Sequence, residues 1–368
     1  MNTPAYLDHN ASSPMHAAVI EAMSDVMGEM GNASSVHAFG RRHRRHVEDA
    51  RLEVAALVGA QPDKVVFTGG GTEANNLALK ATGRQTVIVS SIEHDSVLQA
   101  ADDAQRVAVD RDGVVDLTDL QNALDAGGAL ISVMRANNET GVLQPVADIA
   151  EMANGAGGLL HTDAVQAAGR LPLDIGALGV SMLSLSAHKI GGPQGVGALV
   201  LGADVPFSAQ IRGGGQERGR RAGTENAAGI VGFGVAARLA RERLACMTGV
   251  GALRDRLEAR LRREMADAVV FGERVARLPN TSCFAVPGLS SETLVMGLDL
   301  AGLAVSAGSA CSSGKVTPSH VLQAMGVPET LAACAIRVSL GTENSESEID
   351  RLVTALVALR ERRSASAA

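Results

Sequence analysis

Residues 65–80 read VVFTGGGTEANNLALK, and this run predicts a β-strand, a glycine-rich turn and an α-helix that begins near Thr72. Glycine lets the backbone of the turn approach a ligand closely, because it has no side chain. The first turn of the helix presents free backbone N–H groups and the positive end of the helix dipole. The segment therefore predicts one unit of an α/β fold with a phosphate site at the start of the helix.

The same glycines leave other interpretations open. Gly69, Gly71 and Ala74 fit the pattern G-x-G-x-x-A. Glu93 closes the next predicted strand, at about the distance at which dinucleotide-binding proteins place a ribose-binding acid. A tight turn that only small residues fit is the simplest alternative. The turn alone does not decide between a phosphate ligand, a dinucleotide and no ligand.

Short apolar runs alternate with helical patterns on both sides of this segment, from about residue 60 to residue 200. Strands of nearly continuous apolar residues are typical of a mostly parallel sheet that helices cover on both faces. We therefore expect an α/β fold with a mostly parallel seven-stranded sheet. The predicted strands are residues 64–67, 86–90, 106–109, 129–134, 158–163, 181–186 and 197–201.

The pattern changes after Gly229. A long helical segment with one interruption comes first, and short strands follow at residues 281–286 and 304–308. Ser345 and Glu348 form a capping box ahead of the last helix. We expect this part to be a small α+β domain. The predicted boundaries are 15–250 for the large domain, and 1–14 with 251–368 for the small domain that carries the cysteine loop.

The composition restricts the class of protein. The formal net charge of -7 argues against a nucleic-acid-binding protein, and no apolar run is long enough to span a membrane. The first residues show no signal-peptide pattern, so we expect a cytoplasmic location. The basic run RRHRRH at residues 41–46 is expected to be a solvated helix face. No metal site is expected, because the four cysteines are widely spaced: Cys246, Cys283, Cys311 and Cys334.

Three polar residues follow predicted strands, at the edge of the sheet where α/β proteins bind ligands. Asp163 ends one strand, Lys189 lies between a strand and a glycine turn, and His94 follows a third strand. Each has a simpler explanation alone: a helix-capping Asp, a lysine whose amine stays in solvent, and a structural His. Together with Thr72 they supply what pyridoxal phosphate needs, which is a Schiff-base lysine, an acid for the pyridine nitrogen and a phosphate cup.

Further motifs extend this interpretation over nearly the whole chain. In chain order they are YLDHNASS, GNASSVHAFGR, TGGGTEANNLA, MRANNETGVLQP, HTDAVQAAG, SLSAHKIGGPQGVGAL, RGGGQERGRRAGTENAA and GSACSSG. This series resembles the pyridoxal-phosphate-dependent cysteine desulfurases, and most of all the nitrogenase-associated type. The resemblance implies a homodimeric, fold-type I enzyme of the class V aminotransferase family. Such an enzyme takes sulfur from L-cysteine, releases L-alanine and holds the sulfur as a cysteine persulfide for iron–sulfur cluster assembly.

The resemblance also implies a role for each candidate site residue. Lys189 would bind the cofactor as a Schiff base, Asp163 would pair with its pyridinium nitrogen, and His94 would stack on the ring and move protons. Asn138 and Arg337 would orient the substrate carboxylate, which suits a bidentate guanidinium. The other cofactor contacts would come from Gln166 at the ring hydroxyl, from Gly71, Thr72, Ser186 and His188 around the phosphate, from Asn138, and from Thr224 of the partner subunit.

Cys311 lies within SAGSACSSG, residues 306–314, a run of glycine and small polar residues. The resemblance makes this thiol the group that attacks the substrate sulfur and later meets a cluster scaffold or another sulfur-acceptor protein. A loop built from small residues suits both tasks. The other cysteines, Cys246, Cys283 and Cys334, are expected to be small core residues.

Several alternatives stay open at this stage. A selenocysteine lyase or an aminotransferase on the same fold would use the same residues and differ in its products. A thiol hydrolase built on Cys311 and a histidine would leave Lys189 and Asp163 without a purpose. A non-enzymatic scaffold that binds iron would need clustered ligands, and the cysteines are scattered.

Overall fold

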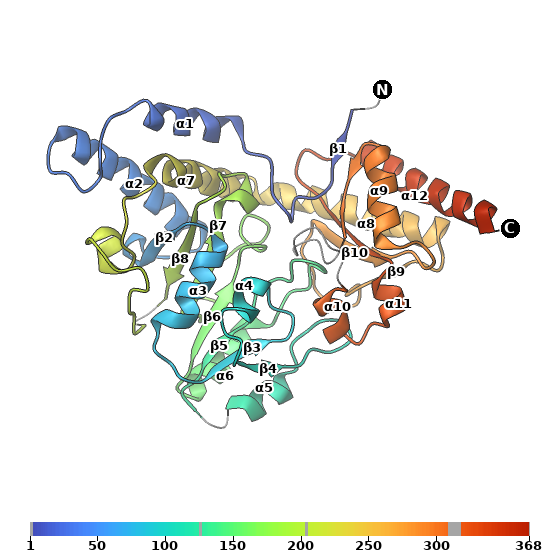
Figure 1. Cartoon of the computed structure of the whole chain (residues 1–368), viewed down its shortest axis with the longest axis horizontal. Coiled ribbons are helices and arrows are strands. Elements are labelled where there is room, and N and C mark those ends of the chain that lie inside the picture. The colour runs from blue at the N-terminus through green and yellow to red at the C-terminus, as the bar shows by residue number, and fades with distance from the viewer. Residues whose placement is uncertain (1–2, 125–126, 203–204, 308–317, 368) are drawn as a thin grey trace.

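The computed structural model describes residues 3–124, 127–202, 205–307 and 318–367. The chain forms two bodies of secondary structure that lie side by side (Figure 1), one around a seven-stranded sheet and one around a four-stranded sheet. Helix α8 (Met247–Glu264) carries the chain from the first body to the second. The N-terminal strand β1 (Ala5–Tyr6) pairs in parallel with β11 (Leu303–Ala304), so the chain starts in the second body.

The seven-stranded sheet is formed by the strands predicted between residues 60 and 200. Its order is β2-β8-β7-β6-β5-β3-β4. The pairings from β7 through to β4 are parallel, whereas β8 runs antiparallel to both of its neighbours. The predicted α/β fold with a mostly parallel sheet is therefore confirmed. The strands are β2 (Val65–Thr68), β3 (Val87–Ser90), β4 (Gln105–Val107), β5 (Leu130–Ser132), β6 (Leu159–Asp163), β7 (Met182–Ser186) and β8 (Gly197–Leu201).

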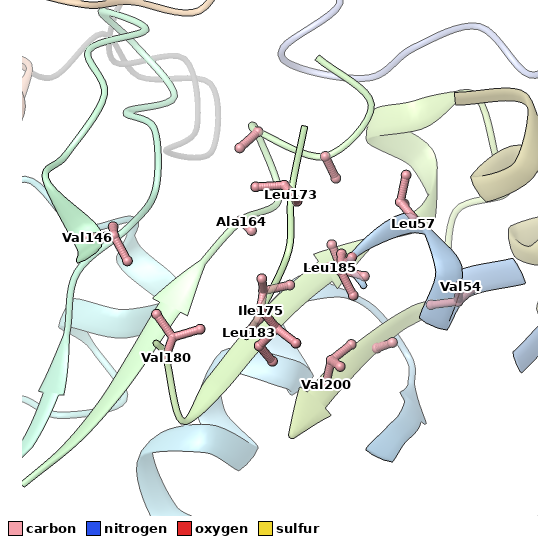
Figure 2. Packing of buried hydrophobic residues seen from close by; sticks show 14 of the residues in the cluster. Val54, Leu57, Val146, Ala164, Leu173, Ile175, Val180, Leu183, Leu185 and Val200 are labelled. Carbon is pink, nitrogen blue, oxygen red and sulfur yellow. The ribbon is translucent and has the colours of Figure 1, made fainter. Parts of the chain in front are cut away.

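Helices cover both faces of this sheet, because successive strand residues point to opposite sides. Val66 of β2 packs on one side, in a core shared with α3 (Gly71–Ala81) and α4 (Asp95–Leu98). Val65 and Phe67 pack on the other side, in a larger core shared with α2 (Ala38–Leu57), α5 (Leu117–Leu124), α6 (Val146–Gly155) and α7 (Ala227–Glu242). Figure 2 shows aliphatic side chains of α2, β7 and β8 meeting in this larger core. Helix α1 (Ala17–Met27) packs against α7 from outside.

The second body is an α+β unit, as predicted. Its antiparallel sheet has the order β12-β13-β10-β9, and helices α8, α9 and α12 share one core with it. Ala5 and Leu7 belong to that same core. The proposed domain boundaries at residues 14 and 250 stay a prediction. The elements are β9 (Val269–Val270), β10 (Thr281–Ala285), α9 (Ser291–Leu300), β12 (Ser306–Ala307), α10 (His320–Ala324), α11 (Glu329–Ala332), β13 (Ala335–Ser339) and α12 (Glu346–Ala367).

Local predictions in this part are mostly confirmed. The Ser345 backbone N–H donates to Glu348 Oε2 at 2.8 Å, which is half of the predicted capping box. The long helical segment is interrupted once, by a single turn between α7 and α8. Cys246 lies in that turn and is exposed, so its expected place in the core was wrong. A short link between two helices stays at the surface, because its backbone needs water as a hydrogen-bond partner.

The basic run at residues 41–46 lies on α2, as expected, but its face is not wholly solvated. His43 is buried. His46 contacts Glu29 at 3.3 Å, so its ring is held against the protein. In the part of the chain that the structure describes, no helix has the length and apolar character to cross a membrane.

Candidate active site

A cavity of about 320 Å3 lies where strands β6 and β7 end. The carboxyl ends of neighbouring parallel strands meet at one edge of a sheet, and this edge is where α/β folds bind ligands. The cavity therefore gathers residues that are far apart in the sequence. Of the predicted site residues it is lined by Gly71, Thr72, His94, Asn138, Asp163, Gln166, Ser186, His188 and Lys189.

The start of α3 forms one wall of the cavity. Gly70 precedes the helix with a φ of 150°, and no side chain caps the first backbone N–H groups. A Cβ added to Gly71 would lie 3.0 Å from a methyl group of Val165, so a larger residue would crowd the wall. Uncapped N–H groups beside a cavity are a binding site for an anion such as a phosphate group.

Asp163 places a carboxylate in the lining of the cavity, next to Asn75 of α3. Its side chain is 8% exposed, with Oδ2 accepting from Asn75 Nδ2 at 2.7 Å and Oδ1 accepting from the Val165 backbone N–H at 2.9 Å. A turn follows Asp163 rather than a helix, so the helix-capping explanation does not apply. The carboxylate is thus oriented by two donors and lines the cavity.

Lys189 reaches the cavity from a single turn of 3₁₀ helix, Ala187–Ile190, directly after β7. Its Nζ donates to the backbone carbonyls of Asn10 at 2.5 Å and Ala11 at 2.9 Å. These two carbonyl oxygens orient the amine. The neighbouring His188 ring has a pKa lowered to about 4, first by burial and then by the charge of Lys189. The amine is thus oriented by the N-terminal segment.

His94 lies at the N-terminal end of α4. Its Nδ1 accepts from the Ser96 backbone N–H at 3.0 Å. A backbone N–H can only donate, so the ring proton of the neutral imidazole is assigned to Nε2. The ring lines the cavity and can carry a proton there.

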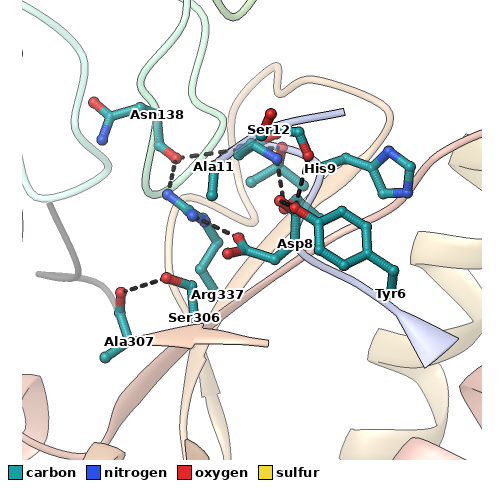
Figure 3. Close-up of polar contacts among 12 residues, drawn as sticks. Tyr6, Asp8, His9, Ala11, Ser12, Asn138, Ser306, Ala307 and Arg337 are labelled. Carbon is teal, nitrogen blue, oxygen red and sulfur yellow. Dashed lines mark hydrogen bonds and ion pairs between the residues drawn. The ribbon is translucent and has the colours of Figure 1, made fainter. Parts of the chain in front are cut away.

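Arg337 of β13 lies beside the cavity, in contact with residues from three other segments. Figure 3 shows its guanidinium between the backbone carbonyl of Asn138 (3.0 Å) and Asp8 Oδ1 (2.7 Å). The side-chain Oδ1 of Asn138 and the Nε of Arg337 are buried and have no hydrogen-bond partner. A carboxylate ligand would accept from Arg337 Nε and share the guanidinium with Asp8, whereas Asn138 Oδ1 can only accept from a donor group.

Two of the predicted site residues that the structure describes do not line the cavity: Thr224, and Arg337, which lies beside it. Thr224 is exposed and does not line it. Cys311 lies outside the described residues, and so does most of the loop that carries it. Within the described ranges, no group of three or more His, Cys, Asp or Glu side chains could hold a metal ion.

Glu93 does not support the dinucleotide alternative. It is completely buried, and its Oε1 accepts from the Met134 backbone N–H at 2.8 Å. Burial, followed by the nearby charge of Asp163, raises the pKa of Glu93 to about 8. Because the carboxyl group is enclosed and does not line the cavity, it cannot bind a ribose, and that interpretation was wrong.

Sequence reasoning missed the residue that connects the two bodies at the site. Asn10 is buried, its backbone O accepts from Lys189 and Gln166, and its Nδ2 donates to Asn138 O at 3.2 Å and Thr281 Oγ1 at 3.0 Å. The motif YLDHNASS contains Asn10, but nothing in a short N-terminal run indicates what it will contact.

Comparisons with known proteins identify the family of the chain. Residues 5–352 match the family model described as aminotransferase class-V. A cysteine desulfurase of Sinorhizobium fredii is 45% identical over 97% of this chain and 96% of its own length. The cysteine desulfurase NifS of Azotobacter vinelandii is 42% identical over 95% of this chain and 90% of its own. The X-ray structure of a NifS-like protein from Rickettsia africae superposes with a TM-score of 0.90 at 34% identity, covering 97% of this chain and 99% of that one. The chain belongs to the class-V aminotransferase family.

Proposed function

We propose that the protein is a pyridoxal-phosphate-dependent cysteine desulfurase. The observation that carries the proposal is the cavity itself, which brings an amine, a carboxylate and an uncapped helix start together. Relatives named cysteine desulfurase, 40–46% identical over at least 95% of this chain, support it. A solved neighbour described as SspA in complex with cysteine, with a TM-score of 0.79 at 30% identity over 91% of this chain and 98% of that one, supports the substrate.

The residues present fit pyridoxal phosphate. The phosphate would be held by the N–H groups at the start of α3 with Gly71 and Thr72, together with Ser186 and His188. Asp163 would hold the pyridine nitrogen in its protonated form, and Lys189 would supply the amine that binds the cofactor. When bound, the cofactor withdraws electrons from the substrate, which weakens the bonds at its α-carbon.

The chain's own groups would then bind the substrate and move protons. Arg337 would bind the carboxylate of L-cysteine, since its Nε is a buried donor without a hydrogen-bond partner, and Asn138 would donate to the same carboxylate from Nδ2. His94 would carry a proton at Nε2, and Lys189 would do so at Nζ.

Cys311 would perform the sulfur transfer. Its thiolate attacks the sulfur of the substrate, an S–S bond forms, and the C–S bond breaks. The electron pair of that bond goes to carbon, which takes a proton and leaves as L-alanine. The substrate sulfur stays on Cys311 as a persulfide, which then passes its outer sulfur to an acceptor thiol.

The assembly and the destination of the sulfur are part of the same proposal. We expect a cytoplasmic homodimer in which Thr224 reaches the phosphate of the partner's site, and an iron–sulfur cluster scaffold or another sulfur-acceptor protein as partner. Nitrogenase maturation is the proposed destination, on the resemblance of the motifs. Lys189→Ala and Thr224→Ala chains mixed as heterodimers should regain activity if sites are shared; no recovery in verified heterodimers would contradict sharing.

The decisive experiment maps both covalent attachments. The protein is loaded with pyridoxal phosphate, reduced with borohydride and digested, and mass spectrometry should find the cofactor on Lys189. After treatment with cysteine and an alkylating agent, the persulfide should be found on Cys311, with alanine formed in equal amount. Cys311→Ser should lose both products, whereas Cys246→Ser serves as the matched control and should keep them. Keto-acid turnover without alanine would instead indicate an aminotransferase.

A further inference from the structure

Arg170 is a buried cation that the proposed mechanism does not use. It lies in the turn after β6 and is 7% exposed. Its Nη1 donates to Oε1 and, at 2.9 Å, to the backbone O of Gln166, while its Nη2 donates to His9 O at 3.1 Å. All three acceptors are neutral, whereas a buried guanidinium is ordinarily paired with a carboxylate. Among the residues that the structure describes, no carboxylate is hydrogen-bonded to this guanidinium, which lies next to the Gln166 side chain that lines the cavity.

Arg170 determines which way the Gln166 side chain faces. A guanidinium has donors only, so the Gln166 atom beside it must be the oxygen, Oε1. At the other end of the amide, Nε2 donates to the backbone O of Asn10 at 3.0 Å, and a carbonyl oxygen can only accept. Both neighbours select the same orientation. The NH2 group uses one hydrogen for Asn10 and keeps the second for a ligand in the cavity that Gln166 lines.

We propose that Arg170 is a positioning residue, which holds Gln166 as a hydrogen-bond donor toward a negatively charged oxygen on the ring of the bound cofactor. This inference rests on the proposed function, because it concerns how that cofactor is bound. A cation that donates to the amide oxygen polarises the amide and strengthens the bond from its NH2 group.

The electrostatics of Arg170 agree with this role. Burial, and after it the charge of Arg337, lowers the pKa of Arg170 to about 9. The charge of Arg170 in turn contributes to lowering the pKa of His9, after the larger effect of burial. None of the three hydrogen bonds that Arg170 makes cancels its charge, so its field extends to an anionic oxygen bound beside Gln166.

The test compares two ligands that differ by that one oxygen. The protein is freed of cofactor and titrated with pyridoxal 5'-phosphate or with its 3-deoxy analogue, which lacks the ring oxygen, and Kd is measured by absorbance. Arg170→Met should weaken binding of pyridoxal phosphate by about tenfold, the size of one charge-assisted hydrogen bond. Binding of the 3-deoxy analogue should change by less than about twofold. Arg170→Lys keeps a donor and a charge, and should restore most of the difference.

Arg135 provides the matched control. It is a partly buried arginine whose pKa is also lowered by burial, and its Nη1 donates to Gln144 O at 2.5 Å rather than to Gln166. Arg135→Met should change the affinity for the two ligands by equal factors. This control therefore measures how much Kd changes when a partly buried arginine is removed but the contacts of the Gln166 amide are kept.

The outcomes separate this inference from the proposed function. Equal weakening for both ligands in Arg170→Met would overturn the positioning role and leave Arg170 a stabilising residue. Failure of the unaltered protein to bind pyridoxal phosphate would instead contradict the proposed function. Where Arg170→Met does not fold, Gln166→Leu tests the same bond, and it should show the same selective tenfold loss; an unselective loss there would overturn the inference too.

Discussion

Two buried arginines differ in the groups that accept their hydrogen bonds. Arg51 of α2 donates to both carboxylate oxygens of Glu217, at 2.8 and 2.9 Å, and lies over the ring of Phe67 at 4.7 Å. Arg170, behind the cavity, donates only to neutral oxygens. Burying a charge without a partner is unfavourable by several kcal/mol. The region around Arg51 and Glu217, here the paired region, supplies a carboxylate for its buried arginine, whereas no carboxylate among the described residues is hydrogen-bonded to Arg170.

The difference shows that a buried charge can either stabilise the backbone conformation or stay available to bind a ligand. In the paired region Glu217 has a φ of 48°, an unfavourable conformation for a residue with a side chain. The ion pair and a hydrogen bond from the Phe67 N–H at 2.9 Å hold it there. At the cavity, the Asp163 carboxylate accepts from neutral donors. The Arg51–Glu217 pair therefore stabilises the backbone, whereas the Asp163 carboxylate lines the cavity and stays available to a ligand.

The largest effect is expected from breaking the pair. Glu217→Gln leaves the buried Arg51 guanidinium with only the half-exposed Glu48 carboxylate, and should lower the free energy of unfolding by about 3–5 kcal/mol. Glu48→Gln is the control, because Glu48 contacts Arg51 at 3.2 Å but its side chain is 46% exposed. The control should lose less than about 1 kcal/mol. Denaturant titration measures both, and equal losses would remove the distinction between the two regions.

Neutralising a charge at the cavity should lower the activity strongly and the stability little, which is the opposite of the effect expected at Glu217. Asp163→Asn keeps the shape of the side chain and removes the charge that, in the proposed function, would hold the cofactor's pyridine nitrogen protonated. We expect alanine formation to fall roughly 10²- to 10³-fold, with little change in the denaturation midpoint. Alanine release and urea denaturation on the same preparation check this. A large loss of stability with near-normal turnover would place Asp163 with the paired residues.

Glu93 makes the comparison dependent on pH. Its pKa of about 8 in the folded protein lies above its ordinary value of 4.5, so between these pH values the folded state binds more protons than the unfolded state. The contribution of Glu93 to stability is therefore present at low pH and is lost as the pH rises through 8. Glu93→Gln does not titrate but keeps an acceptor for the Met134 N–H. Its stability relative to the unaltered protein should rise by about 1.4 kcal/mol per pH unit between pH 5 and 8.

Unfolding measurements at pH 5, 6, 7 and 8 test this slope. The difference between the two proteins isolates Glu93, because every other group titrates in both. A difference that stays constant with pH would show that Glu93 is already ionised in the folded protein. The Glu93 carboxylate would then be a buried charge, and its raised pKa would be contradicted.

The smallest effect is expected at Cys246, which belongs to neither region. Its side chain is exposed in the link between α7 and α8. Cys246→Ser should change the free energy of unfolding by less than about 0.5 kcal/mol and leave alanine formation unchanged. Denaturant titration and the alanine assay measure both. Loss of persulfide in this variant would move the sulfur-accepting role away from Cys311.

The sequence by itself determined the strands, the mostly parallel sheet and the common edge at which Asp163, Ser186 and Lys189 meet. Apolar periodicity reports local structure, and parallel strands place their ends together whatever the loops do. The roles of these residues came from the resemblance of the motifs. The antiparallel direction of β8 was not predictable, because a buried strand is apolar in either direction.

Only the tertiary structure decided the contacts between distant segments. Asn10 meets Gln166 and Lys189 across more than a hundred residues, and Arg51 meets Glu217 in the same way. No periodicity records such pairs, because they depend on how the elements pack. Arg170 and Gln166 are four residues apart, yet their significance lies in burial without a carboxylate. A sequence shows that a charge exists, and the packing around it determines whether the chain neutralises that charge or keeps it for a ligand.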